Sequence, residues 1–337
     1  MTTPELPQEL PEGSFDDDQP FELKESHFFA VDQKFLLSGA ARGFDLFTRR
    51  GDQFLLYRSG DLAFTVDDAD ALGQAGFRVL HILNSQREKY LQYLEKTMLT
   101  TLVDESIPVE ARSTALYDMS ASVIGDLMAN PDSKRHIARS KELVEGIATF
   151  VGHAPGAFQS LFSLDRLDAY VVTHCINTCI FGIGLGNTMG ITDGAEIKAL
   201  GLGCLLHDLG KQVIPQRIVN KPAKLSAQEW AIMKRHPELG VQLCRKSGGI
   251  EELSLLAIQQ HHERLDGTGY PQELRGDQIH LFARIVAAAD VFDAMTSARP
   301  YSPGHDTFPA LKLMKEQLAG KLDPEVFRQL VLMLKAN

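Results

Sequence analysis

Cysteine, positive charge and long hydrophobic runs are all scarce in this sequence. Its four cysteines, Cys175, Cys179, Cys204 and Cys244, lie in apolar patterns without CxxC spacing, which indicates reduced core thiols in a cytoplasmic protein rather than disulfides or zinc thiolates. No apolar run reaches the ~20 residues of a membrane span, and the N-terminus lacks the basic and apolar regions of a signal peptide. Lys and Arg number 34 against 44 Asp and Glu, and the net charge of −10 argues against a protein that binds nucleic-acid polymers by neutralising phosphates.

Residues 1–22 differ in composition from the rest of the chain. Seven acids, four prolines and no Lys or Arg fall in this segment, which is typical of a disordered acidic tail. The whole chain has 337 residues, of which 44% are hydrophobic, enough to bury more than one core. We expect a small α+β domain at 23–85, a helical connector at 86–150 and a helical domain at 151–337.

Short runs of β type dominate residues 27–83, namely HFFAV, FDLFT, QFLLY and FRVLHIL, and Thr65 opens a helix before the last run. Ser85 with Glu88 forms a capping-box signature for a following helix, and the pattern then stays helical, with helices at 109–128 and 133–150. The predicted fold class is therefore mainly α, an all-helical bundle preceded by a small α+β domain and a helical connector. Because the α+β domain has no GxGxxG or Walker-type loop, we favour a dimerisation or sensory module over a second active site.

Seven potential metal ligands are concentrated in the second half of the chain. They are His174, His207, Asp208, His236, His261, His262 and Asp290. Imidazole and carboxylate suit Fe, Mn, Zn, Ni or Co, and seven such groups exceed what one ion requires, so two ions are the natural count. Two cations ~3.5–4 Å apart can share a bridging carboxylate and activate a water towards phosphorus. This ligand set favours phosphodiester hydrolysis.

The places of these residues on the expected helices support convergence. An apolar helical stripe from Ile197 to Cys204 ends in Asp208, and an unpaired buried carboxylate is costly unless a cation lies beside it. A lone histidine on an apolar face is more often a hydrogen-bonded core residue, and this alternative applies to His174 and His236 individually. The pair His207-Asp208 and the run HHERLDGTGYP are more specific signals, since the latter joins a histidine pair to a glycine-rich turn.

Four stretches of the sequence resemble the HD-GYP family of metal-dependent phosphohydrolases, which includes cyclic di-GMP phosphodiesterases. They are LLHDLGKQVIP, NKPAKLSAQEWAIMKRHPELG, QQHHERLDGTGYP and RIVAAADVFDAMTSARPY, in the family's order. The likeness covers about Pro155 to the C-terminus and implies an all-helical bundle. It implies two ions that share Asp208, one with His174, His207 and Asp290, and the other with His236, His261 and His262.

The resemblance also implies roles for residues outside the ligand set. Lys211 corresponds to a lysine close to the scissile phosphate, where a cation stabilises developing charge. Without the resemblance, Lys211 is equally well explained as a cation at a helix C-terminus. Asp168 matches an acid near the leaving group, and Arg299 matches an arginine that binds substrate phosphate or base. Gly269 and Tyr270 belong to the loop that shapes the substrate pocket and contacts partner proteins.

Two positions depart from the family pattern. Members with three metals carry a glutamate four residues before the first ligand histidine, where this chain has Tyr170, so we expect two ions, Fe or Mn, rather than three. Many members continue RPY with a basic residue, whereas Ser302 follows Tyr301 here. We therefore expect one phosphate contact to be absent.

These observations predict a cytoplasmic dinuclear-metal phosphodiesterase that opens cyclic di-GMP to pGpG and can continue to GMP. One alternative is a signalling module that binds the cyclic dinucleotide with little or no turnover. Another is a phosphodiesterase for a different cyclic dinucleotide, such as cyclic GMP-AMP. We favour the enzyme because a binding module has no evident need for all seven ligands. Protein partners at the GYP loop and a homodimer are further expectations.

Overall fold

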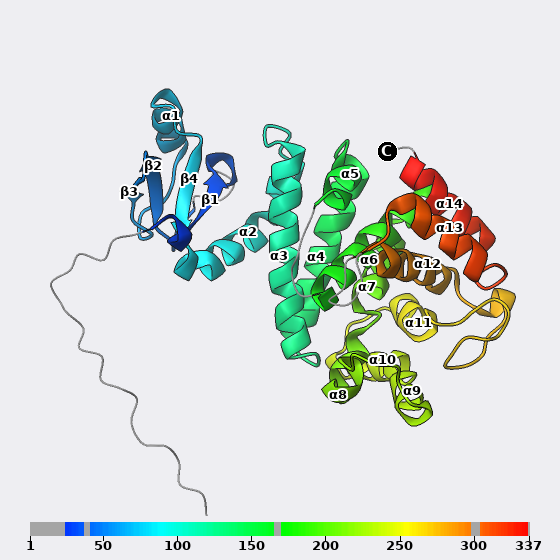
Figure 1. Cartoon of the computed structure of the whole chain (residues 1–337). Helices are drawn as coiled ribbons and strands as arrows, with labels where there is room; N and C mark the ends of the chain where they lie inside the picture. The colour runs from blue at the N-terminus through cyan, green and yellow to red at the C-terminus, as the bar shows by residue number, and fades with distance from the viewer. Residues whose placement is uncertain (1–23, 37–40, 165–169, 298–303, 336–337) are drawn as a thin grey trace, which may run out of the picture.

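The computed structural model describes residues 24–36, 41–164, 170–297 and 304–335 (Figure 1). Helices make up most of this part of the chain, and a small antiparallel sheet stands at its N-terminal end. The predicted fold class, mainly α with a preceding α+β unit, is therefore confirmed. The predicted acidic tail at 1–22 lies outside the described residues.

Four short strands form the N-terminal sheet, in the spatial order β1-β4-β2-β3 with antiparallel neighbours. The elements of this unit are η1 (Glu25–His27), β1 (Phe28–Asp32), η2 (Gln33–Leu36), β2 (Leu46–Arg50), β3 (Gln53–Arg58), α1 (Val66–Gln74) and β4 (Val79–Leu83). Alternate residues of β4, Leu80 and Ile82, are fully buried, as the two-residue period of a strand requires. Thr65 caps α1 by accepting a hydrogen bond from the Asp68 amide, so the predicted helix start is confirmed.

Three long helices connect the sheet to the rest of the molecule. They are α2 (Arg87–Val103), α3 (Val109–Ala129) and α4 (Lys134–His153). The predicted capping box of Ser85 and Glu88 is wrong, because Ser85 lies inside the 3-10 turn η3 (Asn84–Gln86). Gln86 is instead the N-cap of α2, and its side chain makes no capping bond.

The remaining elements form the helical bundle, in which α7 is a central helix. They are α5 (Ala157–Phe162), α6 (Tyr170–Thr188), α7 (Gly194–Leu206), η4 (Leu209–Val213), α8 (Gln216–Val219), α9 (Ala227–Met233), α10 (His236–Ser247), α11 (Glu252–Gln260), η5 (Gly276–Gln278), α12 (Leu281–Thr296), α13 (Thr307–Gln317) and α14 (Pro324–Lys335). The last turns of α7, from Ala199 to Leu206, are buried, and α4, α6, α11 and α12 pack against it. Residues at its C-terminal end consequently lie deep inside the bundle.

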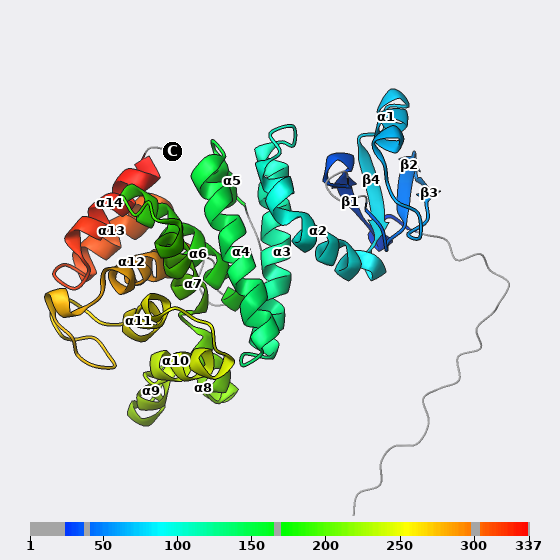
Figure 2. The ribbon, with the colours of Figure 1, turned by 180° about the vertical axis from the view of Figure 1, so that it is seen from behind.

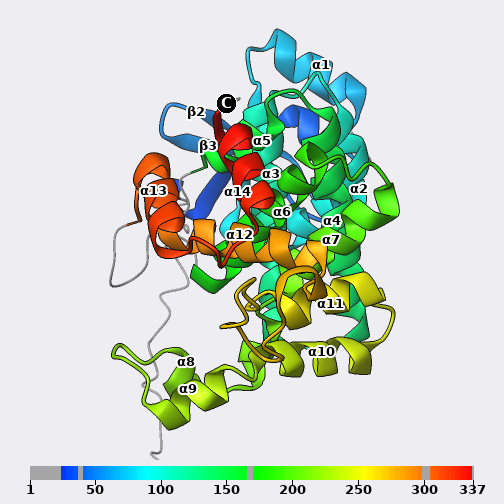
Figure 3. The ribbon, with the colours of Figure 1, turned by 90° about the vertical axis from the view of Figure 1, so that its right-hand side faces the viewer.

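One hydrophobic core joins the sheet, the connector and the bundle. Buried side chains from Val31 on β1 to Met333 on α14 form a single cluster. Figures 1 and 2 show α2 to α4 between the sheet and the other helices, and Figure 3 shows α8 and α9 at the edge of the bundle. Arg139 on α4 reaches Glu95 of α2 at 2.7 Å and Asp126 of α3 at 2.5 Å. The domain limits at 85 and 150 stay predictions.

The four cysteines are free thiols, and all are buried, as predicted. Burial raises the pKa of the Cys179 thiol well above its usual range, which keeps it protonated and unreactive. Within the described ranges, none of the helices combines the length and the apolar character that crossing a membrane requires.

Candidate metal centre

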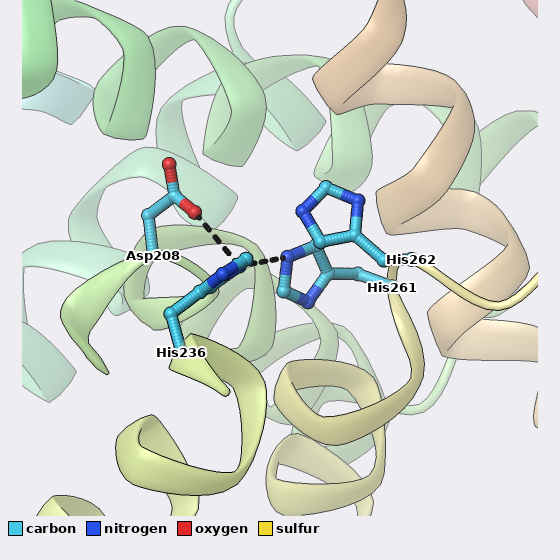
Figure 4. A group of neighbouring side chains, drawn as sticks. All are labelled: Asp208, His236, His261 and His262. Atoms are coloured by element: carbon cyan, nitrogen blue, oxygen red, sulfur yellow. Dashed lines mark hydrogen bonds and ion pairs between the residues drawn. The ribbon is translucent and has the colours of Figure 1, made fainter. Parts of the chain in front are cut away.

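Five segments bring the seven predicted ligands to one place. They are His174 on α6, His207 and Asp208 between α7 and η4, His236 at the start of α10, His261 and His262 after α11, and Asp290 on α12. Figure 4 shows four of these side chains converging. The expected helical run through Asp208 is wrong, because α7 ends at Leu206 and Asp208 is the N-cap of η4. The turn still directs the Asp208 carboxylate into the site.

His174, His207 and Asp290 form the first of two groups. Their nearest ligand atoms all lie within 4.8 Å of one another. The Nε2 atoms of His174 and His207 are 3.2 Å apart, and Asp290 Oδ1 lies 3.3 Å from His174 Nε2. This grouping is the one that the resemblance implies for one ion.

The second group contains Asp208, His236, His261 and His262, with ligand atoms again within 4.8 Å of one another (Figure 4). The Nε2 atoms of His236 and His261 are 3.2 Å apart. Asp208 Oδ1 lies 3.4 Å from His236 Nε2, and Asp208 Oδ2 lies 3.5 Å from His207 Nε2. The Asp208 carboxylate thus contacts both groups, as a bridging ligand would.

The imidazole rings of the site face each other through their Nε2 atoms, which are 3.2 Å apart in the pairs His174–His207 and His236–His261. The Nδ1 atoms of His207, His236 and His261 donate to backbone carbonyls at 2.7 Å, 2.9 Å and 2.7 Å. A neutral ring that donates from Nδ1 has only a lone pair at Nε2. The Nε2 atoms of His236 and His261 therefore face each other as two acceptors, with no hydrogen between them. A cation between the rings removes this repulsion.

Buried carboxylates complete the support of His174. Its Nδ1 donates to Asp293 Oδ2 at 2.6 Å, and Asn177 and Ser297 each donate to Asp293 Oδ1 at 2.8 Å. Burial alone would lower the pKa of His174, but the carboxylates of Asp290 and Asp293 raise it to about 10. A carboxylate behind a histidine is the usual arrangement for a metal ligand, since it orients the ring and increases its basicity.

The other titratable groups are held in the protonation states that metal ligands need. Burial lowers the pKa of His236 to about 4, and lowers the pKa values of His261 and His262 well below the usual range. Burial would raise the pKa of Asp208, but Lys211 and neighbouring histidines hold it well below its ordinary value. At neutral pH His236, His261 and His262 are therefore neutral and Asp208 is ionised, the forms that bind cations.

One atom shows directly that the protein groups alone leave the site incomplete. Asp208 Oδ1 is buried and accepts no hydrogen bond, although a buried carboxylate oxygen without a partner costs several kcal/mol. A divalent cation at this position would satisfy it. The orphaned oxygen, the facing lone pairs and the His/Asp donor set fit divalent metal binding.

Lys211 lies beside the bridging carboxylate. Its Nζ donates to Asp208 Oδ2 at 2.5 Å, and burial, which would lower its pKa, is overcome by Asp208, which raises it. The ammonium therefore points into the site and not at a helix C-terminus, which removes the helix-dipole alternative as the main role of this lysine.

Five of the seven ligands, His174, Asp208, His236, His262 and Asp290, line a cavity of about 620 Å³. Lys211, Arg264, Trp230 and Tyr270 also line it. The Tyr270 ring lies over His262, with centroids 4.7 Å apart and planes inclined by 32°. Gly269 is buried behind the cavity, where a Cβ would approach the Arg264 nitrogen to 2.4 Å. Only glycine permits the loop to pass this close to the backbone.

Several predicted positions cannot be placed. Asp168, Arg299 and Ser302 lie outside the described residues. Their roles in leaving-group chemistry and phosphate binding stay predictions, as does the consequence of Tyr170 for the number of ions.

Three residues that the sequence did not indicate also lie at the site. Asp293 holds His174, and its spacing of three from Asp290 on one helix could have signalled it. Glu263 is buried and accepts from the amides of Gln272 at 2.7 Å and Leu274 at 3.0 Å, which fixes the GYP loop. Arg264 donates to the carbonyls of His261 and Glu263 and lines the cavity. Nothing in the sequence around Glu263 and Arg264 marks them as residues of the site rather than as ordinary polar residues of a loop.

Comparison with known proteins places this site in a family. Residues 186–326 match a family model described as HD domain. The resemblance to HD-GYP proteins is confirmed as well. A solved HDG"Y"P protein from Bdellovibrio bacteriovorus superposes with a TM-score of 0.65 over 91% of this chain and 99% of that protein, at 23% identity. At this identity the likeness establishes the fold.

Curated relatives match a little over half of the chain. A cyclic di-GMP phosphodiesterase of Pseudomonas aeruginosa is 39% identical over 194 residues, which cover 58% of this chain and 46% of the relative. The 3'3'-cGAMP-specific phosphodiesterase 3 of Vibrio cholerae is 32% identical over 216 residues, 64% of this chain and 45% of the relative. The aligned parts thus span less than half the length of these relatives.

Proposed function

We propose that this chain is a dinuclear-metal phosphodiesterase that hydrolyses cyclic di-GMP to pGpG and can continue to GMP. The observation that carries the proposal is the arrangement around Asp208. One carboxylate contacts two groups of imidazoles whose lone pairs face each other, at the floor of an open cavity. The names of the curated relatives support a cyclic dinucleotide as substrate.

Each ion would be held by the residues of one group, with Asp208 shared. Bound there, two divalent ions, which we propose to be Fe or Mn, supply Lewis acidity and the activation of water. Asp293 keeps His174 oriented with its Nε2 towards the site, and the backbone carbonyls do the same for His207, His236 and His261. The ammonium of Lys211 places positive charge where charge develops on a phosphodiester during cleavage.

Two alternatives keep the same site but change the outcome. The match to a cGAMP-specific relative favours, as a second candidate, cleavage of a mixed cyclic GMP-AMP dinucleotide. A signalling module that binds without turnover is the other, and it would retain nucleotide affinity in the absence of products. We further propose that the chain acts in the reducing cytoplasm, where its thiols persist, that it forms a homodimer, and that its GYP loop contacts partner proteins.

Hydrolysis assays on purified protein test the proposal. Protein loaded anaerobically with Fe or Mn is incubated side by side with cyclic di-GMP and cyclic GMP-AMP, and products are separated by chromatography. We expect pGpG from cyclic di-GMP, and loss of both turnover and bound metal in Asp208→Ala. The exposed substitution Asp52→Ala is the matched control. Absence of hydrolysis of either dinucleotide with both metals, under reducing conditions, would overturn the proposal.

A further inference from the structure

The cavity above the metal centre has an aromatic rim as well as a charged floor. Trp230, the single tryptophan of the chain, lies on α9 and lines the cavity while remaining 45% exposed. Its ring meets Tyr270 edge to face, with centroids 6.0 Å apart and planes at 80°. Tyr270 in turn covers the ligand His262. These three rings, which we call the aromatic wall, run from the cavity mouth to the metal centre.

Local bonds fix the outer end of the aromatic wall. Ser226 and Glu229 cap α9 reciprocally, and Lys221 Nζ contacts both carboxylate oxygens of Glu229, at 2.9 Å and 2.7 Å. The ligand His236 follows closely after α9, and its Nδ1 donates to the carbonyl of Met233. Trp230 is thereby held at a set position relative to the metal ligands, although its helix α9 lies at the edge of the bundle (Figure 3).

Two amide side chains face the same cavity from the neighbouring segment. Asn220 Nδ2 donates to Gln216 Oε1 at 3.1 Å, and both residues line the cavity. The remaining Asn220 Oδ1 and Gln216 Nε2 form an acceptor and a donor side by side, the pattern that the edge of a nucleobase can pair with. The rim therefore offers a flat apolar surface and amide hydrogen bonds, and the floor offers Lys211 and Arg264.

This division matches the chemistry of a nucleotide, whose base is flat and uncharged and whose phosphate is anionic. We propose that Trp230 is the stacking surface for one purine base of the substrate, and that Asn220 and Gln216 contact the edge of that base. The proposal rests on the proposed function in taking a cyclic dinucleotide as substrate. Stacking on an aromatic ring is tolerant of base identity, so base preference arises at the two amides.

Stacking of the base stabilises the bound substrate and the transition state to the same extent. Its loss therefore raises KM more than it lowers kcat. In Trp230→Ala we expect KM for cyclic di-GMP to rise on the order of tenfold to a hundredfold, and Trp230→Phe to recover most of the loss. The ratio of kcat/KM for cyclic di-GMP to that for methyl p-nitrophenyl phosphate, a diester without a base, should fall at least tenfold. Ile232→Ala, which changes an exposed residue of the same helix, is the control and should leave this ratio unchanged.

A second measurement does not depend on hydrolysis. The tryptophan emission of the unsubstituted protein arises from Trp230 alone, and titration with GMP should quench it to saturation. An equal loss of kcat/KM towards both diesters in Trp230→Ala would show a role in folding α9 and overturn the proposal. Emission that does not respond to GMP would also overturn it. If the unsubstituted protein cleaves neither diester, the proposed function fails, whereas the quenching still decides the role of Trp230.

Discussion

The buried histidines of the metal centre make the metal-free protein sensitive to acid. His236 has a pKa of about 4 in the folded protein, against 6.5 for an ordinary histidine, so between these values the unfolded chain binds more protons. The stability that is linked to neutral His236 is therefore fully present above about pH 6.5 and is lost as the pH falls towards 4. His261 and His262 act in the same direction. His174, with its pKa raised to about 10, contributes stability below pH 6.5 that is lost only as the pH rises towards 10.

We expect the unfolding temperature of chelator-treated protein to fall steeply between pH 6.5 and 4.5. At ~1.4 kcal/mol per pKa unit, His236 alone accounts for about 3 kcal/mol of this loss. His236→Gln should fall less steeply over the same range, since glutamine does not titrate. Thermal melts followed by circular dichroism at several pH values check this, and a flat profile would contradict the burial of neutral imidazoles.

Asp293 is expected to control metal affinity without touching the metal. Asp293→Asn keeps the size of the side chain but removes the charge that holds His174 Nδ1. We expect metal affinity to drop about 10- to 100-fold, with the fold retained. Calorimetric titration with Mn²⁺ measures this, and Asp52→Asn on the surface is the matched control. Equal affinities for the two variants would show that Asp293 is only a packing residue.

The approach of η4 to α10 sets the distance between Asp208 and His236. Gly210 makes this approach possible, because a Cβ there would lie 1.9 Å from the His236 carbonyl oxygen and 2.6 Å from the Gly240 nitrogen. A side chain at this position must push the two elements apart. The spacing of the bridging carboxylate thus depends on a glycine that binds nothing itself.

Gly210→Ala should lower the free energy of unfolding by about 1–3 kcal/mol and reduce the bound metal. Gly125→Ala, in the C-terminal part of α3 with nothing within 4 Å of a new Cβ, should instead stabilise the protein by up to about 1 kcal/mol. Urea denaturation of both variants gives the comparison. A neutral Gly210→Ala would show that η4 and α10 can separate without cost.

Local patterns were sufficient to predict most elements. Short runs of β-type residues predicted all four strands, and Thr65 marked the start of α1 correctly. The signature of Ser85 and Glu88 failed because the chain enters α2 through a 3-10 turn, which local sequence does not distinguish from a capped helix. Asp208 was placed on a helix for a similar reason, because apolar residues continue at helical spacing beyond Leu206, where α7 ends.

The candidate site was predictable where residue type is unusual for its surroundings. Histidines and aspartates on apolar faces predicted the seven positions that the structure brings together. Asp293 was missed because a polar residue on a helix normally faces water, and only the packing of α6 on α12 brings it to His174. Trp230 was missed because an exposed aromatic on a short helix carries no periodic signal, and its place beside Tyr270 depends on tertiary structure.

The molecule as a whole couples its N-terminal unit to the metal centre by packing. The hydrophobic cluster continues from β1 through α2, α3 and α4 to α7, and α7 ends at Leu206, directly before His207. Side chains of α4 thus lie in direct contact with the helix that precedes Asp208. This continuity is the physical basis on which the unit at 23–85 could act on the site.

The central claim is that two groups of side chains hold two ions through a shared Asp208. Metal analysis of anaerobically purified protein, with Asp208→Ala and Asp52→Ala prepared in parallel, tests it most directly. The account predicts close to two equivalents of Fe or Mn per chain in the unsubstituted protein and in Asp52→Ala, and almost none in Asp208→Ala. Metal below half an equivalent in all three, after reconstitution with either ion, would contradict it.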